Sequence, residues 1–184
     1  MLERQPVPPL VAKPEQGRSY PLWLWLALSA LVIVLDQLSK YAITTHFAFN
    51  EALTVTPFFD LVRAHNPGAA FGFLNAAGGW QRWLFTAISV GASVLIVALL
   101  PRHLKEKLFC LALALILGGA LGNLIDRVAY GFVVDFLDFH WDGYHFAAFN
   151  LADSAITGGA GLLLLDSFLK TRRERAARTA STGE

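Results

Sequence analysis

Four long apolar stretches constrain this chain more than any other feature of its sequence. Each approaches the roughly 20 residues that an α-helix needs to cross a hydrocarbon core about 30 Å thick. They lie near Leu22–Ile43, Trp83–Leu100, Leu108–Ile125 and Ala147–Leu169. The first stretch is long and no small-residue cleavage site follows it, so we interpret it as a retained helix and not as a removable signal peptide. The sequence therefore predicts an all-α membrane protein with four transmembrane helices.

The composition agrees with a single membrane domain. Hydrophobic residues make up 55% of the chain, charged residues only 16%, and the mean hydropathy is positive. Such values are typical of membrane proteins and not of soluble globular domains. The net charge of +1 gives no sign of a nucleic-acid partner, and we expect none. A single cysteine, Cys110, excludes an intrachain disulfide.

The distribution of Lys and Arg predicts the orientation in the membrane. Eleven of the 15 lie in the N-terminal segment, in the 101–107 link or in the C-terminal tail. Positive residues concentrate on the cytoplasmic side of membrane proteins. We therefore expect both termini in the cytoplasm, with the 44–82 and 126–148 segments facing outward.

The chain divides into three parts. Residues 1–20 contain four prolines and scattered charges, and we expect a disordered cytoplasmic leader. Residues 21–170 form the four-helix transmembrane domain, and residues 171–184 a basic cytoplasmic tail near anionic membrane lipid. Within the 44–79 link, "LTVTPFFDLVRAH" predicts short strands, so a small extracytoplasmic β-containing link joins the first two helices. The 129–148 segment is interpreted as a mobile aromatic link at the membrane interface.

Polar residues at membrane depth are costly, so each needs a partner or a purpose. Asp36 and Lys40 are four residues apart on one helical face, which permits an ion pair. Asn123 and Asp126 are three apart in the third stretch, and "NLAD", residues 150–153, repeats that spacing in the fourth. Because the third helix runs outward and the fourth inward, both polar pairs reach the same membrane depth.

Three carboxylates converge near this interface: Asp126, Asp135 and Asp153. The nearest basic partner in the sequence is Arg127, which leaves at least one carboxylate without a counter-ion. Two carboxylates that share a proton can act as the base and the acid of an aspartyl protease. Intramembrane acids also form structural networks or proton relays, as in a small proton-coupled transporter or channel. The spacing of the residues leaves both interpretations open.

Other hydrolytic chemistries have little support. The five histidines include no HExxH pair, and no GxSxG elbow occurs. We expect no metal and no cofactor.

Five motifs in order carry a resemblance to a known family. They are "DQLSK" at 36–40, "NPGAAFGFL" at 66–74, "GNLIDR" at 122–127, "VVDF" at 133–136 and "FNLADSAI" at 149–156. In this order and across about residues 22–169, the chain closely resembles the lipoprotein signal peptidases, or signal peptidase II family.

The resemblance implies an aspartyl endopeptidase of the bacterial inner (cytoplasmic) membrane, with its active site near the periplasmic face. Such an enzyme removes the signal peptide from prolipoproteins, cleaving just before a cysteine that carries diacylglycerol, and globomycin inhibits it. The family motifs imply that Asp135 and Asp153 are the catalytic pair. They also imply a set of supporting or substrate-contacting residues: Asp36, Lys40, Asn66, Gly68, Asn123, Asp126, Arg127, Asn150 and Ala152.

Overall fold

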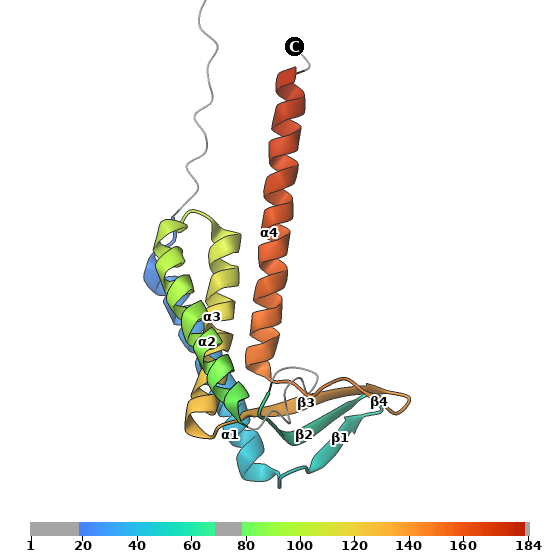
Figure 1. Ribbon diagram of the computed structural model, residues 1–184. Coiled ribbons are helices and arrows are strands. Elements are labelled where there is room, and N and C mark those ends of the chain that lie inside the picture. The colour runs from blue at the N-terminus through green and yellow to red at the C-terminus, as the bar shows by residue number, and fades with distance from the viewer. Residues whose placement is uncertain (1–18, 69–78, 183–184) are drawn as a thin grey trace, which may run out of the picture.

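The computed structural model describes residues 19–68 and 79–182. Four long helices form a bundle with a small antiparallel sheet at one end (Figure 1). The helices are α1 (Leu22–His46), α2 (Trp80–Leu99), α3 (Lys107–Ala129) and α4 (Leu151–Thr182), and the 3₁₀ turn η2 (Leu100–Arg102) follows α2. Most of the predicted leader, residues 1–18, and residues 69–74 of the glycine-containing motif lie outside the described residues.

Three of the helices are long and apolar enough to cross a membrane, namely α1, α2 with η2, and α3. Helix α4 is less apolar, because Asp153, Asp166 and three glycines lie in its first half. The chain is thus a membrane protein with several spans, and the fourth span stays a prediction. The start of α1 and the end of α4 lie at the same end of the bundle, away from the sheet (Figure 1).

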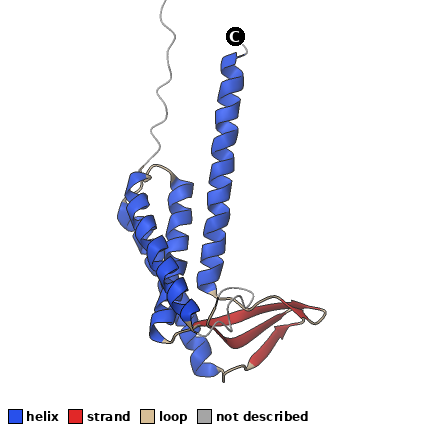
Figure 2. Ribbon diagram, in the orientation of Figure 1, coloured by secondary structure: helices blue, strands red, loops and turns tan. Residues whose placement is uncertain are grey.

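The sheet joins both of the predicted outward links. Strands β1 (Ala52–Thr56) and β2 (Phe59–Asn66) come from the first link, and β3 (Val133–Trp141) and β4 (Tyr144–His145) from the second (Figure 2). Their order is β1-β2-β3-β4, and every neighbouring pair is antiparallel. The strands predicted in the first link are confirmed by β1 and β2. The interpretation of the second link as a mobile aromatic link is wrong, because it contributes β3 and β4, and the fold is not all-α. Apolar residues on both faces of β3 hide the period-two alternation that marks a half-buried strand.

The register of β3 places its side chains relative to both neighbours. Ala64 of β2 lies opposite Asp135, and Asn66 lies opposite Val133. On the other side, the amide of Phe149 donates to the carbonyl of Leu137 at 3.0 Å, and the amide of Leu137 donates back at 2.9 Å. These bonds fix the segment just before α4 against β3, so the start of α4 and Asp135 come together.

Glycines allow α3 to approach its neighbours closely. A Cβ on Gly119 would overlap the backbone carbonyl of Ala152 in α4, and one on Gly122 would lie 2.6 Å from Oδ2 of Asp36 in α1. In the reverse direction, a Cβ on Gly159 of α4 would lie 2.7 Å from the carbonyl oxygen of Ala112. Small residues at such helix crossings are typical of membrane bundles.

We expect Gly119→Ala to lower the stability of the bundle by about 1–3 kcal/mol, because the added methyl group meets backbone that cannot move without shifting α4. Thermal unfolding of the purified protein in detergent measures the loss. The matched control is Gly158→Ala in α4, whose added Cβ meets nothing within 4 Å. Alanine also favours a helix over glycine, so the control is expected to unfold at or above the temperature of the unmodified protein. Equal unfolding temperatures for both variants would contradict this account of the α3–α4 contact.

Candidate active site

Asn150 binds two carboxyl groups that come from different elements. Its side-chain Nδ2 donates to Oδ1 of Asp135 on β3 at 2.7 Å, and its backbone N–H donates to Oδ2 of Asp153 in the first turn of α4 at 3.3 Å. The Asn150 carbonyl Oδ1 accepts from the backbone N–H of Asp153 at 2.9 Å, as expected of a residue that caps a helix start. Asn150 is fully buried, so its geometry is fixed by packing.

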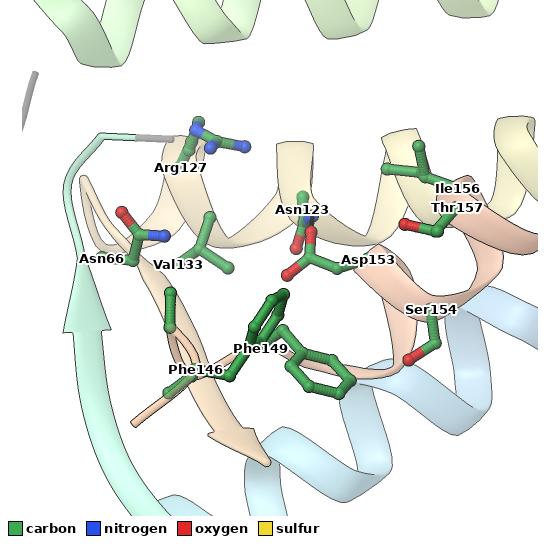
Figure 3. Close-up of a pocket in the computed structure, with 12 residues that line it drawn as sticks. Asn66, Asn123, Arg127, Val133, Phe146, Phe149, Asp153, Ser154, Ile156 and Thr157 are labelled. Carbon is green, nitrogen blue, oxygen red and sulfur yellow. Dashed lines mark hydrogen bonds between the residues drawn. The ribbon is translucent and has the colours of Figure 1, made fainter. Parts of the chain in front are cut away.

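Two further asparagines bind the remaining carboxyl oxygens. Asn66 donates to Oδ2 of Asp135 at 3.0 Å, and Asn123 donates to Oδ1 of Asp153 at 2.7 Å. Figure 3 shows the Asn123 and Asp153 side chains facing each other. Each of the four oxygens of the pair thus accepts an N–H, which orients both carboxyl groups, and no cation of residues 19–68 and 79–182 forms an ion pair with either of them.

The surroundings of Asp135 favour its protonated form. Burial of the side chain, which is only 2% exposed, and the charge of Asp153 raise the pKa of Asp135 to about 7. The hydrogen bonds from Asn66 and Asn150 act in the opposite direction but are weaker. Asp135 therefore holds a proton close to neutral pH, and carboxyl groups perturbed in this way are common in active sites.

A buried ionic cluster lies behind the pair. Lys40 of α1 contacts Oδ2 of Asp36 and Oδ2 of Asp126 at 2.8 Å each, and it donates to Oδ1 of Asn123 at 3.0 Å. The predicted Asp36–Lys40 pair is confirmed. Lys40 also connects the cluster to the pair, because the same Asn123 side chain that accepts from Lys40 donates to Asp153.

Arg127 is not the counter-ion of Asp126, contrary to the expectation from the sequence. Its Nη2 donates to the carbonyl of Gly68 at 3.1 Å, and its guanidinium carbon lies 5.2 Å from the ring centroid of Phe85. Adjacent residues of a helix point about 100° apart, so Asp126 and Arg127 face different neighbours. Asp126 instead pairs with Lys40, 86 positions earlier in the chain.

The two carboxylates of the cluster also fix the elements that carry the pair. Asp36 Oδ1 accepts from the backbone N–H of Ala152 at 2.9 Å, in the first turn of α4. Asp126 Oδ2 accepts from the backbone N–H of Val134 at 3.2 Å, next to Asp135 on β3. Asp36 and Asp126 are thus positioning residues for Asp153 and Asp135 respectively.

A cavity of about 540 Å³ opens beside Asp153. Its polar lining includes Asn66, Asn123 and Arg127, and Phe146 and Phe149 contribute apolar surface (Figure 3). Asp153 lines this cavity directly, whereas Asp135 is more deeply buried.

The structure brings all the predicted site residues together. The side chains of eight of them form one hydrogen-bonded group: Asp36, Lys40, Asn66, Asn123, Asp126, Asp135, Asn150 and Asp153. Gly68 and Ala152 take part through their backbones, and Arg127 lines the cavity. One placement was wrong: Asp135 lies on the paired strand β3 and not in a mobile link.

Sequence reasoning missed Gln37. Its Nε2 donates to Oδ1 of Asp126 at 2.9 Å and to the carbonyl of Gly122 at 3.2 Å, so it joins α1 to α3 beside Lys40. The signal was present in the sequence, because Gln37 precedes Lys40 by three residues and therefore shares its helical face.

Comparisons with known proteins agree with these motifs. The model of the family described as signal peptidase (SPase) II matches residues 28–169. The chain is 58% identical over 168 residues to a lipoprotein signal peptidase of Burkholderia multivorans, covering 91% of this chain and 98% of that one. It is 57% identical over 159 residues to the lipoprotein signal peptidase of Ralstonia nicotianae, covering 86% and 92% respectively.

Solved structures give the same result. A bacterial membrane enzyme determined by the in meso method at 2.3 Å resolution matches with a TM-score of 0.75 and 32% identity, over 84% of this chain and 93% of that one. A second, at 1.9 Å resolution, matches with a TM-score of 0.70 and 32% identity, over 81% and 95%. None of these relatives supports the transporter or channel alternative. The matched family, the relatives and the shared fold together show that this chain belongs to the signal peptidase II family.

Proposed function

We propose that this chain is an aspartyl endopeptidase that removes the signal peptide from prolipoproteins, cleaving just before a diacylglyceryl-modified cysteine. Membership of the signal peptidase II family supports the removal of signal peptides. The observation that carries the aspartyl mechanism is the pair of carboxyl groups bound by Asn150, with Asp153 lining an apolar cavity.

The proposed reaction uses one proton shared by the pair. Asp153, which lines the cavity, takes a proton from a water molecule as that water attacks the scissile carbonyl carbon, and Asp135 gives its proton to the carbonyl oxygen. When the resulting gem-diol collapses, the C–N bond breaks. The leaving amine receives the proton held by Asp153, and Asp135 recovers a proton from a gem-diol hydroxyl. The carboxyl pair is then back in its starting protonation state.

The cavity fits a short extended segment of an apolar peptide. Phe146, Phe149 and Ile156 provide apolar surface beside Asp153. Arg127 also lines the cavity, and its Nε is buried with no hydrogen-bond partner among the described residues. We assign this Nε as a donor to a substrate carbonyl. The lipid on the substrate cysteine would stay in the bilayer beside the helices, and globomycin would compete for the same cavity.

Incubation with a prolipoprotein that carries the diacylglyceryl group tests the proposal. Purified protein in detergent should release a shorter product, globomycin should block the release, and a chelator should not. The same precursor without lipid on its cysteine is the control and should remain uncut. Absence of cleavage together with proton flux in reconstituted vesicles would reject the peptidase in favour of a transporter.

The pKa of Asp135 predicts the pH dependence of cleavage. If Asp135 must be protonated, kcat/KM falls as the pH rises through about 7, where the carboxyl loses its proton. The hydrogen bond from Asn66 lowers that pKa, so Asn66→Ala should raise it and move the alkaline limb to higher pH. Thr157→Ala, on the cavity wall contributed by α4, is the control and should leave the limb in place. If kcat/KM of Asn66→Ala falls at the same pH as that of the unmodified protein, Asp135 is not the group whose deprotonation limits cleavage.

The same shift has a consequence for folding. The pKa of Asp135 is raised in the folded state from the ordinary value of 3.8 for an aspartate to about 7. The proton-linked stabilisation from Asp135 is therefore fully present below about pH 3.8 and is lost as the pH rises through about 7.

We further propose that the sheet lies on the periplasmic side of a bacterial inner membrane, as the positive charge of the opposite side supports. In a Cys110→Ser background, a cysteine at Tyr144, a residue 83% exposed on β4, should react with an impermeant thiol reagent added to intact cells. A cysteine at Lys105, in the link between η2 and α3, should not react. The reverse labelling pattern would invert the orientation.

A further inference from the structure

A second cavity, of about 400 Å³, lies between α1, the end of α3 and the sheet. Strand β3 separates it from the catalytic cavity: Val134 lines the second cavity, whereas Val133 lines the one beside Asp153. Successive side chains of a strand point to opposite faces of a sheet, so the two cavities lie on opposite sides of β3. The second cavity is therefore a separate site.

Arg63 of β2 is the cation of this cavity that lacks a counter-ion. Its Nη1 donates to the carbonyls of Thr44 and Phe47 at 3.1 and 2.8 Å, which anchors the guanidinium at the end of α1. Its Nε is buried with no hydrogen-bond partner, and it forms no ion pair within residues 19–68 and 79–182. The other cation in the lining, Lys40, is already balanced by Asp36 and Asp126.

His65 provides a second unsatisfied polar atom in the same lining. Its ring stacks on Phe132 with centroids 3.8 Å apart, and its Nε2 is buried without a partner among the described residues. Burial and the charge of Arg63 lower the pKa of His65, so the ring is neutral at neutral pH. Buried polar atoms are nearly always hydrogen-bonded, so Nε of Arg63 and Nε2 of His65, on two residues that line one cavity, are candidate donors to a polar ligand.

The rim of the cavity is apolar and aromatic. Leu38 and Tyr41 on α1 are 59% and 68% exposed, and Tyr130 at the end of α3 is 63% exposed. Both helices are membrane-spanning candidates, and tyrosines of membrane proteins gather at headgroup depth. The cavity therefore combines the Arg63 guanidinium with a mouth at the level where the headgroups and acyl chains of a bilayer meet.

We propose that this cavity binds one anionic phospholipid, with the headgroup phosphate on the Arg63 guanidinium and the acyl chains along Leu38 and Tyr41. The planar guanidinium is suited to phosphate oxygens, and the apolar rim gives such a ligand an advantage over free phosphate. Binding here does not depend on cleavage, so the site can be tested without the proposed function.

Native mass spectrometry of the whole chain in nonionic detergent tests the site, with dioleoyl phosphatidylglycerol as the probe. We expect one retained phosphatidylglycerol per protein and a rise in unfolding temperature with added phosphatidylglycerol. Dioleoyl phosphatidylcholine and inorganic phosphate should give neither effect. Arg63→Gln should weaken phosphatidylglycerol binding by roughly ten-fold or more, because a charge-assisted hydrogen bond contributes about that factor.

Arg82→Gln is the matched control. Arg82 lies at the same end of the bundle, its Nη2 also donates to a backbone carbonyl, that of Val128, and it does not line the second cavity. The Arg82→Gln variant should bind phosphatidylglycerol as strongly as the unmodified protein does.

Tyr41→Glu tests the site without touching the anchor of Arg63, in case Arg63→Gln fails to fold. Its exposed carboxylate at the mouth should repel the anionic headgroup and also weaken binding about ten-fold. Equal retention of phosphatidylcholine, a rise in unfolding temperature with phosphate alone, or unchanged binding in a folded Arg63→Gln or Tyr41→Glu variant would each overturn the proposal.

Discussion

Asp135→Asn and Asp153→Asn are each expected to lower the turnover of a lipidated prolipoprotein by roughly 10²–10⁴-fold or more, because each removes one partner of the proton exchange. An asparagine keeps the size of the side chain, and its remaining carbonyl oxygen can still accept an N–H from one neighbouring asparagine. The protein should therefore stay folded and still bind globomycin. The double variant should be hardly worse than either single one, since residues that act as a unit are not additive.

Asp138→Asn is the matched control for this experiment. Asp138 lies on the same strand as Asp135, three residues further along, and its carboxylate contacts His145 on β4 at 2.8 Å. Turnover by this variant should remain near that of the unmodified protein. Thermal unfolding in detergent separates loss of chemistry from loss of structure. A folded Asp135→Asn variant with near-normal turnover would reject the pair and make Asp126 the next candidate partner of Asp153.

Lys40→Met should cause the largest loss of stability of any single change in the cluster. Asp36 and Asp126 are 0% and 1% exposed, and Lys40 lies within 2.8 Å of both. Its removal leaves two buried carboxylates without a cation, and breaking a buried pair in this way costs about 3–5 kcal/mol. Asp126→Asn should cost less, because Lys40 then keeps Asp36 as its partner.

Unfolding by heat or denaturant in detergent measures this difference. The matched control is Lys170→Met: Lys170 pairs with Asp166 at 2.6 Å, but its side chain is 44% exposed. Such a pair contributes only about 0–1 kcal/mol. Adding Asp36→Asn and Asp126→Asn to Lys40→Met should recover much of the loss. Comparable stability of Lys40→Met and Lys170→Met would show that the cluster does not hold the bundle together.

Short-range spacing predicted much of the site. The Asp36–Lys40 pair follows from a separation of four residues on a helix, and the shared faces of Asn123 with Asp126 and of Asn150 with Asp153 follow from a separation of three. The three helices with clear apolar runs could also be predicted from the sequence, because every helix that crosses a membrane needs about 20 apolar residues.

Long-range pairing could not be predicted from the sequence alone. Lys40 and Asp126 meet because α1 packs against α3, and no local pattern indicates which cation a buried carboxylate will face. The strand β3 is stabilised by β2, about 70 residues earlier, so its register is set by a distant partner. The arrangement of Asn66 against Asp135 depends on that register.

The bond from Ala152 to Asp36 spans 116 residues and links the first helix to the last. During synthesis the cluster residues on α1 and α3 emerge well before Asp153, which lies on the last helix. The carboxyl pair can therefore form only after α4 has reached its place beside α1 and α3. A nascent chain halted before that point carries no complete site, so the proposed proteolytic activity begins only when α4 has packed against α1 and α3.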